Sequence, residues 1–421
     1  MAGRGRVYYG WTLVVALGVI TIVTYGTSQY LFGLLVVPAS QELHVSRAQV
    51  SSAYSAGLVV AALLALPVGR LVDRHGARWV LCVGSAVSAA SLLGLSRAGG
   101  IVPFYTLWAG GVGLAMALTL YPVTFVAVAN WFVRRRGSAM ALLTTIGGLS
   151  SPLFVPFSGW LIATHGWRGA LPLLALTQIA MLPLQVAFVR RRPEDLGLAP
   201  DGLPPAGTEE SSDAPAGRGG TTVREAARTP AFWLLTLAGS AGLFAAFALQ
   251  VHQVPYMIAE GLDPVLAASI AGLMGLVSIP GRFVLNVLSQ RVAGQALLAG
   301  ALALMTAAVV VLLFARSTPL FVTYAVLYGI GYGAVNPLRA SVMADHFGRR
   351  AYGAITGVQN VPVILCSAGG PILVGRLFDV TRDYRPALLC LAGAGALAVV
   401  ATALSPAPRA VPTRPVSPTG A

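Results

Sequence analysis

Residues 69–81, with the sequence GRLVDRHGARWVL, place charged residues between two apolar runs of more than 20 residues each. About 20 apolar residues in a helix are enough to cross the hydrocarbon core of a bilayer. The stretch therefore predicts a polar turn between two membrane helices. We expect Asp73 to cap or pair with the end of a neighbouring helix, with Arg74 and Arg78 in water, so that the three residues latch a gate. The alternative is an ordinary loop whose arginines follow only the positive-inside rule.

The composition of the whole chain is that of a membrane protein. Of its 421 residues 56% are apolar and only 10% are charged, with a mean hydropathy of +0.76, whereas a soluble domain is about 25% charged. The net charge of +14 comes from arginines at the ends of apolar runs. No basic domain with interleaved aromatic residues is present, so we do not expect nucleic-acid binding.

No enzyme signature accompanies this composition. We find no nucleophile motif, cofactor fingerprint or phosphate-binding loop, and Cys82, Cys366 and Cys390 each lie alone in an apolar run. Cysteines without ligand-like spacing indicate packing residues rather than a metal site or a disulfide framework. We therefore expect neither catalysis nor a cofactor or metal ion.

The apolar runs predict an all-α membrane protein with twelve spans. Residues 190–229 separate the sixth span from the seventh; they are rich in Pro, Gly, Ser and acidic residues, which predicts a flexible cytoplasmic linker. The chain then divides into a six-helix bundle (1–189), the linker, and a second six-helix bundle with a short tail (230–421). The predicted spans are 10–37, 48–72, 77–97, 101–131, 137–164, 168–189, 230–259, 264–289, 294–315, 318–344, 351–378 and 386–405.

The distribution of arginines predicts the orientation. With the N-terminus inside, 19 arginines fall on the cytoplasmic side, seven fall outside and two lie within spans. Cytoplasmic loops carry the excess of basic residues in membrane proteins. We therefore expect a multi-pass protein of the inner or plasma membrane with both termini in the cytoplasm.

The two halves of the chain repeat each other. ANWFVRRRGSAMA (129–141) aligns without gaps on ADHFGRRAYGAIT (344–356), and LVDR (71–74) matches LSQR (288–291). Duplicated bundles are typical of transporters in which one half rocks against the other. A duplicated catalytic domain would instead repeat catalytic residues, and none appear.

The opening stretch also carries a family resemblance. It resembles the signature between the second and third spans of the major facilitator superfamily, and with the twelve spans and the duplication this resemblance covers about 380 residues. It implies alternating access between two bundles. Gln290 stands in the second half where Asp73 stands in the first, so we expect a charged latch on one side only. The matching residues are Gly69, Leu71, Asp73, Arg74, Gly76 and Arg78.

Four shorter motifs, in order along the chain, are similar to the monocarboxylate transporter and oxalate/formate exchanger group. This resemblance implies transport of small organic anions, and we expect a functional monomer. The motifs are RRRPEDLGLAPDG (190–202), REAARTPAFW (224–233), HQVPY (252–256) and GR (281–282).

Arg282 is the one charged residue of an apolar stretch, LVSIPGRFVLNVL (276–288). A bare charge at mid-bilayer costs several kcal/mol, and nine residues separate Arg282 from Arg291, about 13 Å along a helix. The resemblance implies that an arginine here binds the substrate carboxylate, which suits its planar guanidinium. The alternative is that it snorkels toward the cytoplasm or pairs with a backbone carbonyl.

Departures from the family pattern limit the substrate. Proton-coupled relatives often carry an aspartate one turn before this arginine, where this chain has Ser278, and no acidic residue lies deep in any predicted span. A cationic drug would therefore find no counter-charge. His252 is the remaining candidate for proton coupling, since histidine titrates near neutrality, although a lone histidine is more often a hydrogen-bonded structural residue. Oxalate exchangers add a second basic residue in the eleventh span, where this chain has Gln359, so a monoanion is expected.

Other polar side chains in the spans are candidates to line a cavity, because such groups usually face the bundle interior. The tyrosines could alternatively be packing residues. Arg339 could supply a second charge to the cavity, but Asp345 lies six residues away and a salt-bridged gate is the expected role of both. The substrate-binding candidates besides Arg282 are Tyr25, Gln29, Tyr121, Tyr328, Tyr332, Asn336 and Gln359.

The sequence thus predicts a secondary transporter of a small organic anion, a monocarboxylate above all, with proton coupling left open. The alternative on the same scaffold is an efflux pump for a larger acidic metabolite or drug. A membrane receptor with a transporter fold is a rival of another class, but it would normally carry an appended signalling domain.

Overall fold

A computed structural model describes residues 8–202, 221–288, 291–348 and 351–406, without the side chains of 283–287, 352 and 353. Within these residues the regular structure is helical, as the composition predicts. The elements are α1 Tyr9–Tyr25, η1 Gly26–Tyr30, α2 Leu31–Glu42, α3 Arg47–His75, α4 Ala77–Leu95, α5 Ile101–Tyr105, η2 Thr106–Val112, α6 Gly113–Thr119, α7 Tyr121–Trp131, α8 Arg136–Gly147, α9 Ser150–Phe188, η3 Pro193–Leu196, η4 Pro200–Gly202, α10 Val223–Ala227, α11 Pro230–Ala259, α12 Pro264–Leu288, α13 Gly294–Phe314, α14 Thr318–Phe347, α15 Tyr352–Thr381 and α16 Arg385–Ala403.

Eleven segments of the described chain are long and apolar enough to cross a membrane. The longest, Arg136–Phe188, has 53 residues, which at 1.5 Å per residue is about 80 Å and more than twice the hydrocarbon thickness. Inside it Gly166 leaves the helical conformation, with φ 68° and ψ 166°, a backbone region open to glycine. A division at Gly166 would give the twelve spans that the sequence predicts; that count stays a prediction.

The first and fourth predicted spans are each interrupted by a π-helical turn, η1 (GTSQY) and η2 (TLWAGGV). A π turn widens the helix and changes the direction of the side chains around it, and it is frequent at functional sites. In η1 the ring of Phe154 lies directly against Gly26, where a Cβ would come within 2.2 Å of it. The turn thereby places Gln29 and Tyr30 next to the centre of the molecule.

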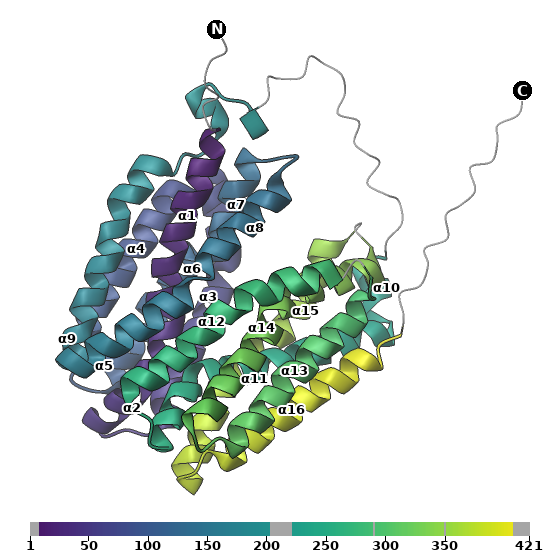
Figure 1. Ribbon diagram of the computed structural model, residues 1–421. Coiled ribbons are helices and arrows are strands. Elements are labelled where there is room, and N and C mark those ends of the chain that lie inside the picture. The colour runs from purple at the N-terminus through teal and green to yellow at the C-terminus, as the bar shows by residue number, and fades with distance from the viewer. Residues whose placement is uncertain (1–7, 203–220, 289–290, 349–350, 407–421) are drawn as a thin grey trace, which may run out of the picture.

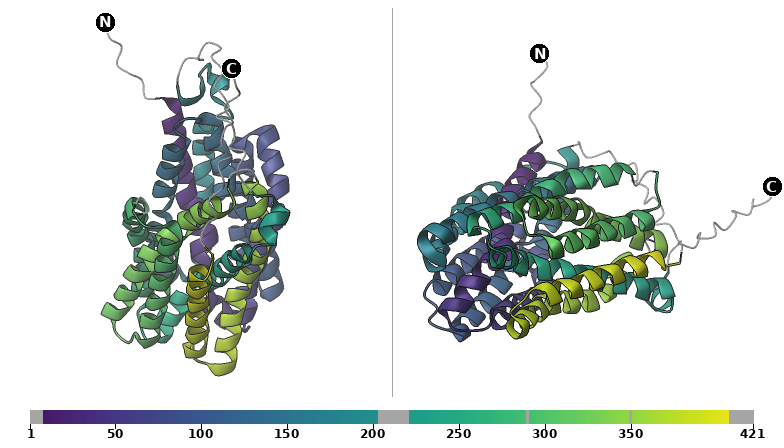
Figure 2. Two further views of the ribbon diagram at one scale, coloured as in Figure 1. Left: turned by 90° about the vertical axis from the view of Figure 1, so that its right-hand side faces the viewer. Right: turned by 60° about the horizontal axis from the view of Figure 1, so that its bottom comes forward.

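Helices α1–α9 and α11–α16 pack as two groups that lie side by side (Figures 1 and 2). The groups touch at the end where α3 and α12 begin, low in Figure 1, and diverge toward the end where the chain begins. We call these the far end and the terminal end. Leu34 and Val155 of the N-terminal group pack in the same buried apolar cluster as the side chains of the C-terminal group. The apolar cores of the two groups are therefore continuous at the far end.

Glycines allow the groups to approach closely at the far end. A Cβ on Gly33 in α2 would lie 2.8 Å from the carbonyl oxygen of Gln250 in α11, and one on Gly375 in α15 would lie 2.8 Å from the Cα of Ala48 in α3. Small residues let helix backbones come together in membrane proteins, where dispersion contacts replace the hydrophobic effect between helices. The far end is therefore closed by backbone-to-backbone packing.

The two described ends of the predicted linker are attached to the helix groups. Tyr8 donates a hydrogen bond to Ala199 O (3.2 Å), and Thr221 N donates one to Phe347 O (3.0 Å). The flexibility that we predict for 190–229 as a whole stays a prediction. The middle of the linker, 203–220, lies outside the described residues.

Asp201, in the first described end of the linker, accepts three hydrogen bonds from the N-terminal group. Its carboxylate accepts hydrogen bonds from three consecutive backbone N–H groups, those of Val133 (3.0 Å), Arg134 (2.8 Å) and Arg135 (3.1 Å), just before α8 begins. Burial raises the pKa of Asp201, but these N–H groups and the charge of Arg135 outweigh it, so that the pKa is lowered from its usual value.

Replacing Asp201 with alanine should release this contact. We expect the Asp201→Ala variant to exchange the backbone hydrogens of 133–135 about fivefold faster, because loss of a helix-capping side chain costs about 1 kcal/mol. Hydrogen–deuterium exchange read by mass spectrometry measures this. Asp195→Ala is the matched control, since the Asp195 carboxylate accepts from Arg192 N within its own turn; equal exchange in both variants would contradict the assignment.

The same contact has a defined pH range. Because the folded-state pKa of Asp201 is lowered, its contribution is fully present above the unfolded value of about 3.9 and is lost only as the pH falls through the lowered folded-state pKa. Protection of 133–135, corrected for intrinsic exchange, should therefore be the same at pH 7 and pH 5. A loss of protection between these pH values would show that another group holds the segment.

Candidate functional site

A central cavity of about 800 Å³ lies between the two helix groups. Its walls include Gly69 and Val72 near the end of α3 and Phe125 and Val126 in α7, all near the terminal end, so the cavity extends toward the end at which the groups diverge. Among the residues predicted to bind substrate, six line it: Tyr25, Gln29, Tyr121, Arg282, Tyr332 and Asn336.

Arg282 lies on α12 and reaches across to the N-terminal group. Its Nη1 donates a hydrogen bond to the carbonyl oxygen of Thr144 (3.2 Å) in α8, and its buried Nε has no hydrogen-bond partner among the described residues. Thr144 O also accepts from Gly148 N at the end of α8, so the guanidinium adds a positive charge where a helix C-terminus favours one. No acidic residue of the described chain forms an ion pair with it.

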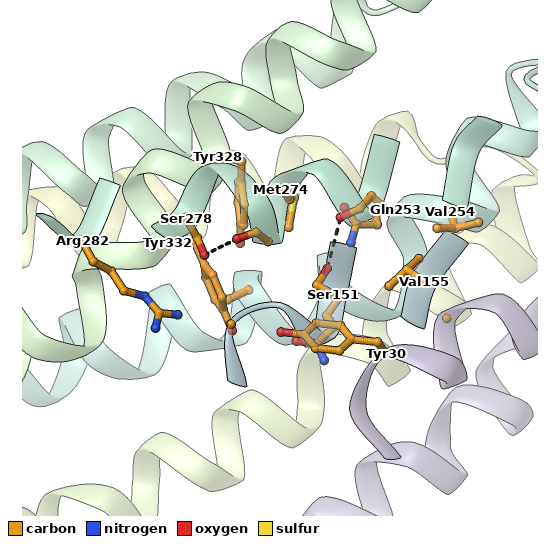
Figure 3. A pocket seen from close by; sticks show the side chains of 16 residues that line it. Tyr30, Ser151, Val155, Gln253, Val254, Met274, Ser278, Arg282, Tyr328 and Tyr332 are labelled. Carbon is orange, nitrogen blue, oxygen red and sulfur yellow. Dashed lines mark hydrogen bonds between the residues drawn. The ribbon is translucent and has the colours of Figure 1, made fainter. Parts of the chain in front are cut away.

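A side chamber of about 40 Å³ adjoins Arg282 and is lined by residues of both groups (Figure 3). A water-sized group occupies roughly 10–15 Å³ on this measure, so the chamber has room for about three. Arg282 lies at one side of the chamber and Gln253 toward the other. The other polar side chains that line it are Tyr30, Ser151, Gln250, Ser278, Tyr328 and Tyr332.

The chamber presents hydrogen-bond donors that no described residue satisfies. The hydroxyl of Tyr328 is buried and has no partner. Gln253 uses its Oε1 to accept from the hydroxyl of Tyr324 (3.0 Å), which leaves its amide N–H groups for the chamber. Ser278, one turn before Arg282, instead donates to the carbonyl oxygen of Gly275 (2.7 Å). A buried donor left unpaired costs about 1–3 kcal/mol, so these groups favour an occupant that carries acceptors.

A hydrogen-bonded cluster adjoins the cavity through Gln29 and Gln250, which line it. The hydroxyl of Tyr54 donates to Gln29 Oε1 (2.6 Å), and Gln250 Nε2 donates to the backbone oxygen of Gln29 (3.1 Å). Gln250 belongs to α11 and Gln29 to η1, so this cluster crosses between the groups. We did not predict Tyr54, Gln250 or Tyr30 as site residues; the signal was present, since each is a polar or aromatic residue within an apolar span.

Aromatic side chains form the walls on both sides of Arg282. The rings of Tyr25 and Tyr121 are 4.8 Å apart, and Tyr121 stacks on Phe125 at 5.0 Å. Across from them Tyr328 stacks on Tyr332 at 6.1 Å, as expected for residues one turn apart on a helix. Tyr332 lines both spaces, whereas Tyr328 lines the chamber alone.

Gln359 does not lie where we predicted. It is buried, with its Nε2 3.3 Å from the sulfur of Met343, and lines neither space. Its neighbour Asn360 lines the cavity and accepts a hydrogen bond from Arg339 Nη2 (2.8 Å). Consecutive helical residues point about 100° apart, so a one-residue error in register exchanges a buried position for an exposed one.

The predicted gate contacts at the terminal end are not made in this structure. The Asp73 carboxylate is exposed and has no partner among the described residues; Arg78 donates instead to Val189 O (2.6 Å). Arg339 and Asp345 form no ion pair, because residues six apart lie about 240° around a helix from each other. Arg74, like Asp73, is exposed at the end of α3. A latch that includes Asp73 stays a prediction for a state closed at this end.

His252 lies outside both spaces, at the closed far end between the groups. Its Nε2 is 2.9 Å from Pro371 O and 3.1 Å from Ser51 Oγ, and its Nδ1 is 3.4 Å from the hydroxyl of Tyr384. These contacts fit the structural alternative for this residue. Its role in proton coupling stays a prediction.

The register of α15 can be tested by thiol labelling. In a variant without the three native cysteines, we expect Asn360→Cys to react with a small water-soluble thiol reagent at least about tenfold faster than Gln359→Cys, because only position 360 lines the cavity. Labelling rates followed by mass spectrometry give the comparison. Faster reaction at position 359 would place the predicted residue, not its neighbour, in the cavity.

The sequence of this chain is similar to those of known proteins. The sequence model of the family described as the Major Facilitator Superfamily matches residues 17–371. Monocarboxylate transporter 13 of Bos taurus is 28% identical over 400 residues, which cover 92% of this chain and 88% of that protein. Human monocarboxylate transporter 11 is 28% identical over 396 residues (90% and 79%), and human monocarboxylate transporter 2 is 25% identical over 347 residues (75% and 68%).

Solved structures show the same fold. A bacterial homologue of the human lysosomal transporter Spinster, described as inward-facing and occupied, superposes with a TM-score of 0.73 at 16% identity and covers 95% of this chain and 96% of its own. A nucleoside transporter superposes with a TM-score of 0.72 at 11% identity, covering 93% and 99%. The resemblance drawn from the opening stretch is thereby confirmed at the level of family and fold.

Proposed function

Since the chain belongs to the major facilitator superfamily and is therefore a multi-pass membrane transporter rather than an enzyme, we propose that it is a secondary transporter of a small monocarboxylate. It would carry this substrate by alternating access, with the cavity open toward the terminal end in the present state. In line with the arginine distribution, this end faces the cytoplasm. The protein acts as a monomer in the cell membrane.

The guanidinium of Arg282 carries this proposal. It is the one charged group that lines the cavity or the side chamber among the described residues, and a single backbone carbonyl occupies it. A cation with no acidic partner in a low-dielectric site attracts an anion strongly, and the planar fork of arginine matches a carboxylate with two parallel hydrogen bonds. One such cation balances one carboxylate.

The side chamber supports a small substrate. An acid whose carboxylate binds Arg282 would place two or three further heavy atoms in the chamber, which has a volume of about 40 Å³. The partnerless Tyr328 hydroxyl and the Gln253 amide would then donate to an oxygen on those atoms. The relatives named as monocarboxylate transporters add weight to this substrate class.

One observation favours a second candidate. At about 800 Å³ the main cavity is as large as the sites that take drug-sized ligands, far more than a three-carbon acid fills. An exporter of a larger acidic metabolite would use this space with the same arginine. The two candidates differ in which anions compete for Arg282, so competition separates them.

Transport by Arg282 variants tests the proposal. In proteoliposomes we expect uptake of lactate, pyruvate, formate or acetate by the wild type and at least a tenfold lower rate for Arg282→Gln, because hydrogen bonds to a charged group contribute about 1.5–3 kcal/mol. Arg282→Lys should retain part of the rate, since it keeps the charge without the fork. Arg316→Gln, whose arginine pairs with Glu260 at the far end, is the control and should transport normally.

The outcomes are distinct. Accumulation driven by an imposed proton gradient would support coupling and make His252 the residue to replace next. If a well-folded wild type takes up none of the four acids but a larger organic anion is carried and lost with Arg282→Gln, the exporter candidate is correct. Transport that Arg282→Gln leaves unchanged would overturn the assignment of the anion site.

Ser278→Asp should weaken substrate binding. Ser278 lines the chamber one turn before Arg282, so a carboxylate there lies beside the guanidinium and would compete with the substrate. We expect about a tenfold higher KM at pH 7.5 and the same increase at pH 5, because a carboxylate beside a guanidinium stays ionised at both pH values. Ser278→Asn is the uncharged control; the same loss with asparagine at both pH values would mean that size, not charge, is responsible.

A further inference from the structure

We propose that Asp379 latches the far end of the transporter: its carboxylate, on α15 of the C-terminal group, caps the first turn of α3 in the N-terminal group. The proposal rests on the alternating-access function above, because a latch needs two states to choose between. It concerns residues distant from Arg282 and from both spaces that adjoin it.

The free backbone N–H groups in the first turn of α3 donate to two side chains, those of Ser46 and Asp379. Ser46, the residue before the helix, accepts from Gln49 N (3.1 Å), and the Gln49 side chain accepts from Ser46 N (2.9 Å). This capping box leaves the first two helical N–H groups without a partner in their own chain segment. Asp379 accepts from both, with Oδ1 3.0 Å from Arg47 N and Oδ2 2.9 Å from Ala48 N.

Charge and packing add to these bonds. A carboxylate at a helix N-terminus is stabilised by the aligned peptide dipoles, and Asp379 supplies it from the opposite helix group. The guanidinium of Arg47 lies 3.8 Å over the ring of Phe378 and donates to the hydroxyl of Tyr384 (2.7 Å). Burial raises the pKa of Tyr384 to about 12, so this hydroxyl remains protonated at neutral pH. Gly375 brings the two backbones together one turn before Asp379.

This contact exists in one state only. When the far end opens, α15 must move away from α3, and the N–H groups of Arg47 and Ala48 lose their charged acceptor to water. An interaction shifts a conformational equilibrium only by its difference between the two states. Asp379 therefore favours the state that is closed at the far end and open toward the terminal end.

Nearby Asp383 provides a matched comparison. Its carboxylate accepts from Arg385 N (2.9 Å) at the start of α16, so it also caps a far-end helix, but within its own group. Removal of Asp383 weakens a cap without separating the groups. An effect specific to Asp379 therefore reports the contact between groups rather than capping in general.

Distance measurement between spin labels tests the latch. In the full chain without native cysteines, Gln41→Cys and Thr318→Cys place labels on exposed far-end positions of the two groups. We expect one short-distance population in the parent protein. In Asp379→Ala the ratio of a longer-distance population to the short one should rise about fivefold, the size expected for a lost helix cap. Asp379→Asn, which keeps one acceptor oxygen, should lie between, and Asp383→Ala should match the parent.

Two results would overturn the proposal. One is an unchanged distance distribution in Asp379→Ala; the other is an equal shift in Asp383→Ala. If Asp379→Ala does not purify as a monodisperse protein, Asp379→Asn against Asp383→Asn decides the question in the same terms. The measurement needs no substrate, so its outcome is independent of whether Arg282 binds a monocarboxylate.

Discussion

The arrangement at the centre of this transporter depends on how one guanidinium is stabilised inside a membrane protein without an acid beside it. A lone charge in hydrocarbon costs several kcal/mol, and the described residues offer Arg282 only the carbonyl oxygen of Thr144. The remaining stabilisation has to come from water in the cavity or from an anion. A wet, aromatic-walled cavity that reaches this residue from one end is the structural consequence.

The same guanidinium connects the site with the movement of the helix groups. Arg282 on α12 donates a hydrogen bond to the last turn of α8, and Gln250 on α11 donates one to the backbone of Gln29, so hydrogen bonds cross between the groups at the level of the site. An anion at Arg282 competes with Thr144 for the same N–H groups. On the proposed mechanism, binding of substrate at Arg282 would therefore weaken a contact between the groups, while glycine packing and the proposed contact of Asp379 would keep the far end together.

The apolar runs of the sequence were sufficient for the helical fold, because the membrane requires every spanning segment to satisfy its own backbone. The family followed from the resemblance of residues 69–81 and was confirmed by the family model. Polar residues inside apolar spans, together with that resemblance, led to Arg282, Tyr25 and Tyr332, which line the cavity. Contacts that depend on the rotation of a helix about its axis could not be predicted from the sequence. Gln359 was predicted at the cavity where Asn360 lines the wall, and Arg339 was predicted to pair with Asp345, although residues six apart on a helix point about 120° away from each other. The contact of Asp379 with α3 could not be predicted, because the sequence does not show which helix begins beside it. Those are properties of packing, and a single sequence contains no direct measure of them.

The volume of the cavity depends on the conformational state in which the transporter is seen. About 800 Å³ is the volume with the terminal end open, and on the proposed alternating-access mechanism most of it would disappear when the groups close around a substrate. The side chamber of about 40 Å³ lies beyond Arg282, between residues that already pack against each other, so it changes least on closure. A substrate is recognised by what remains around it in the closed state. The chamber with its unpaired donors, together with one guanidinium, therefore argues for a small acid more strongly than the open cavity argues for a large one.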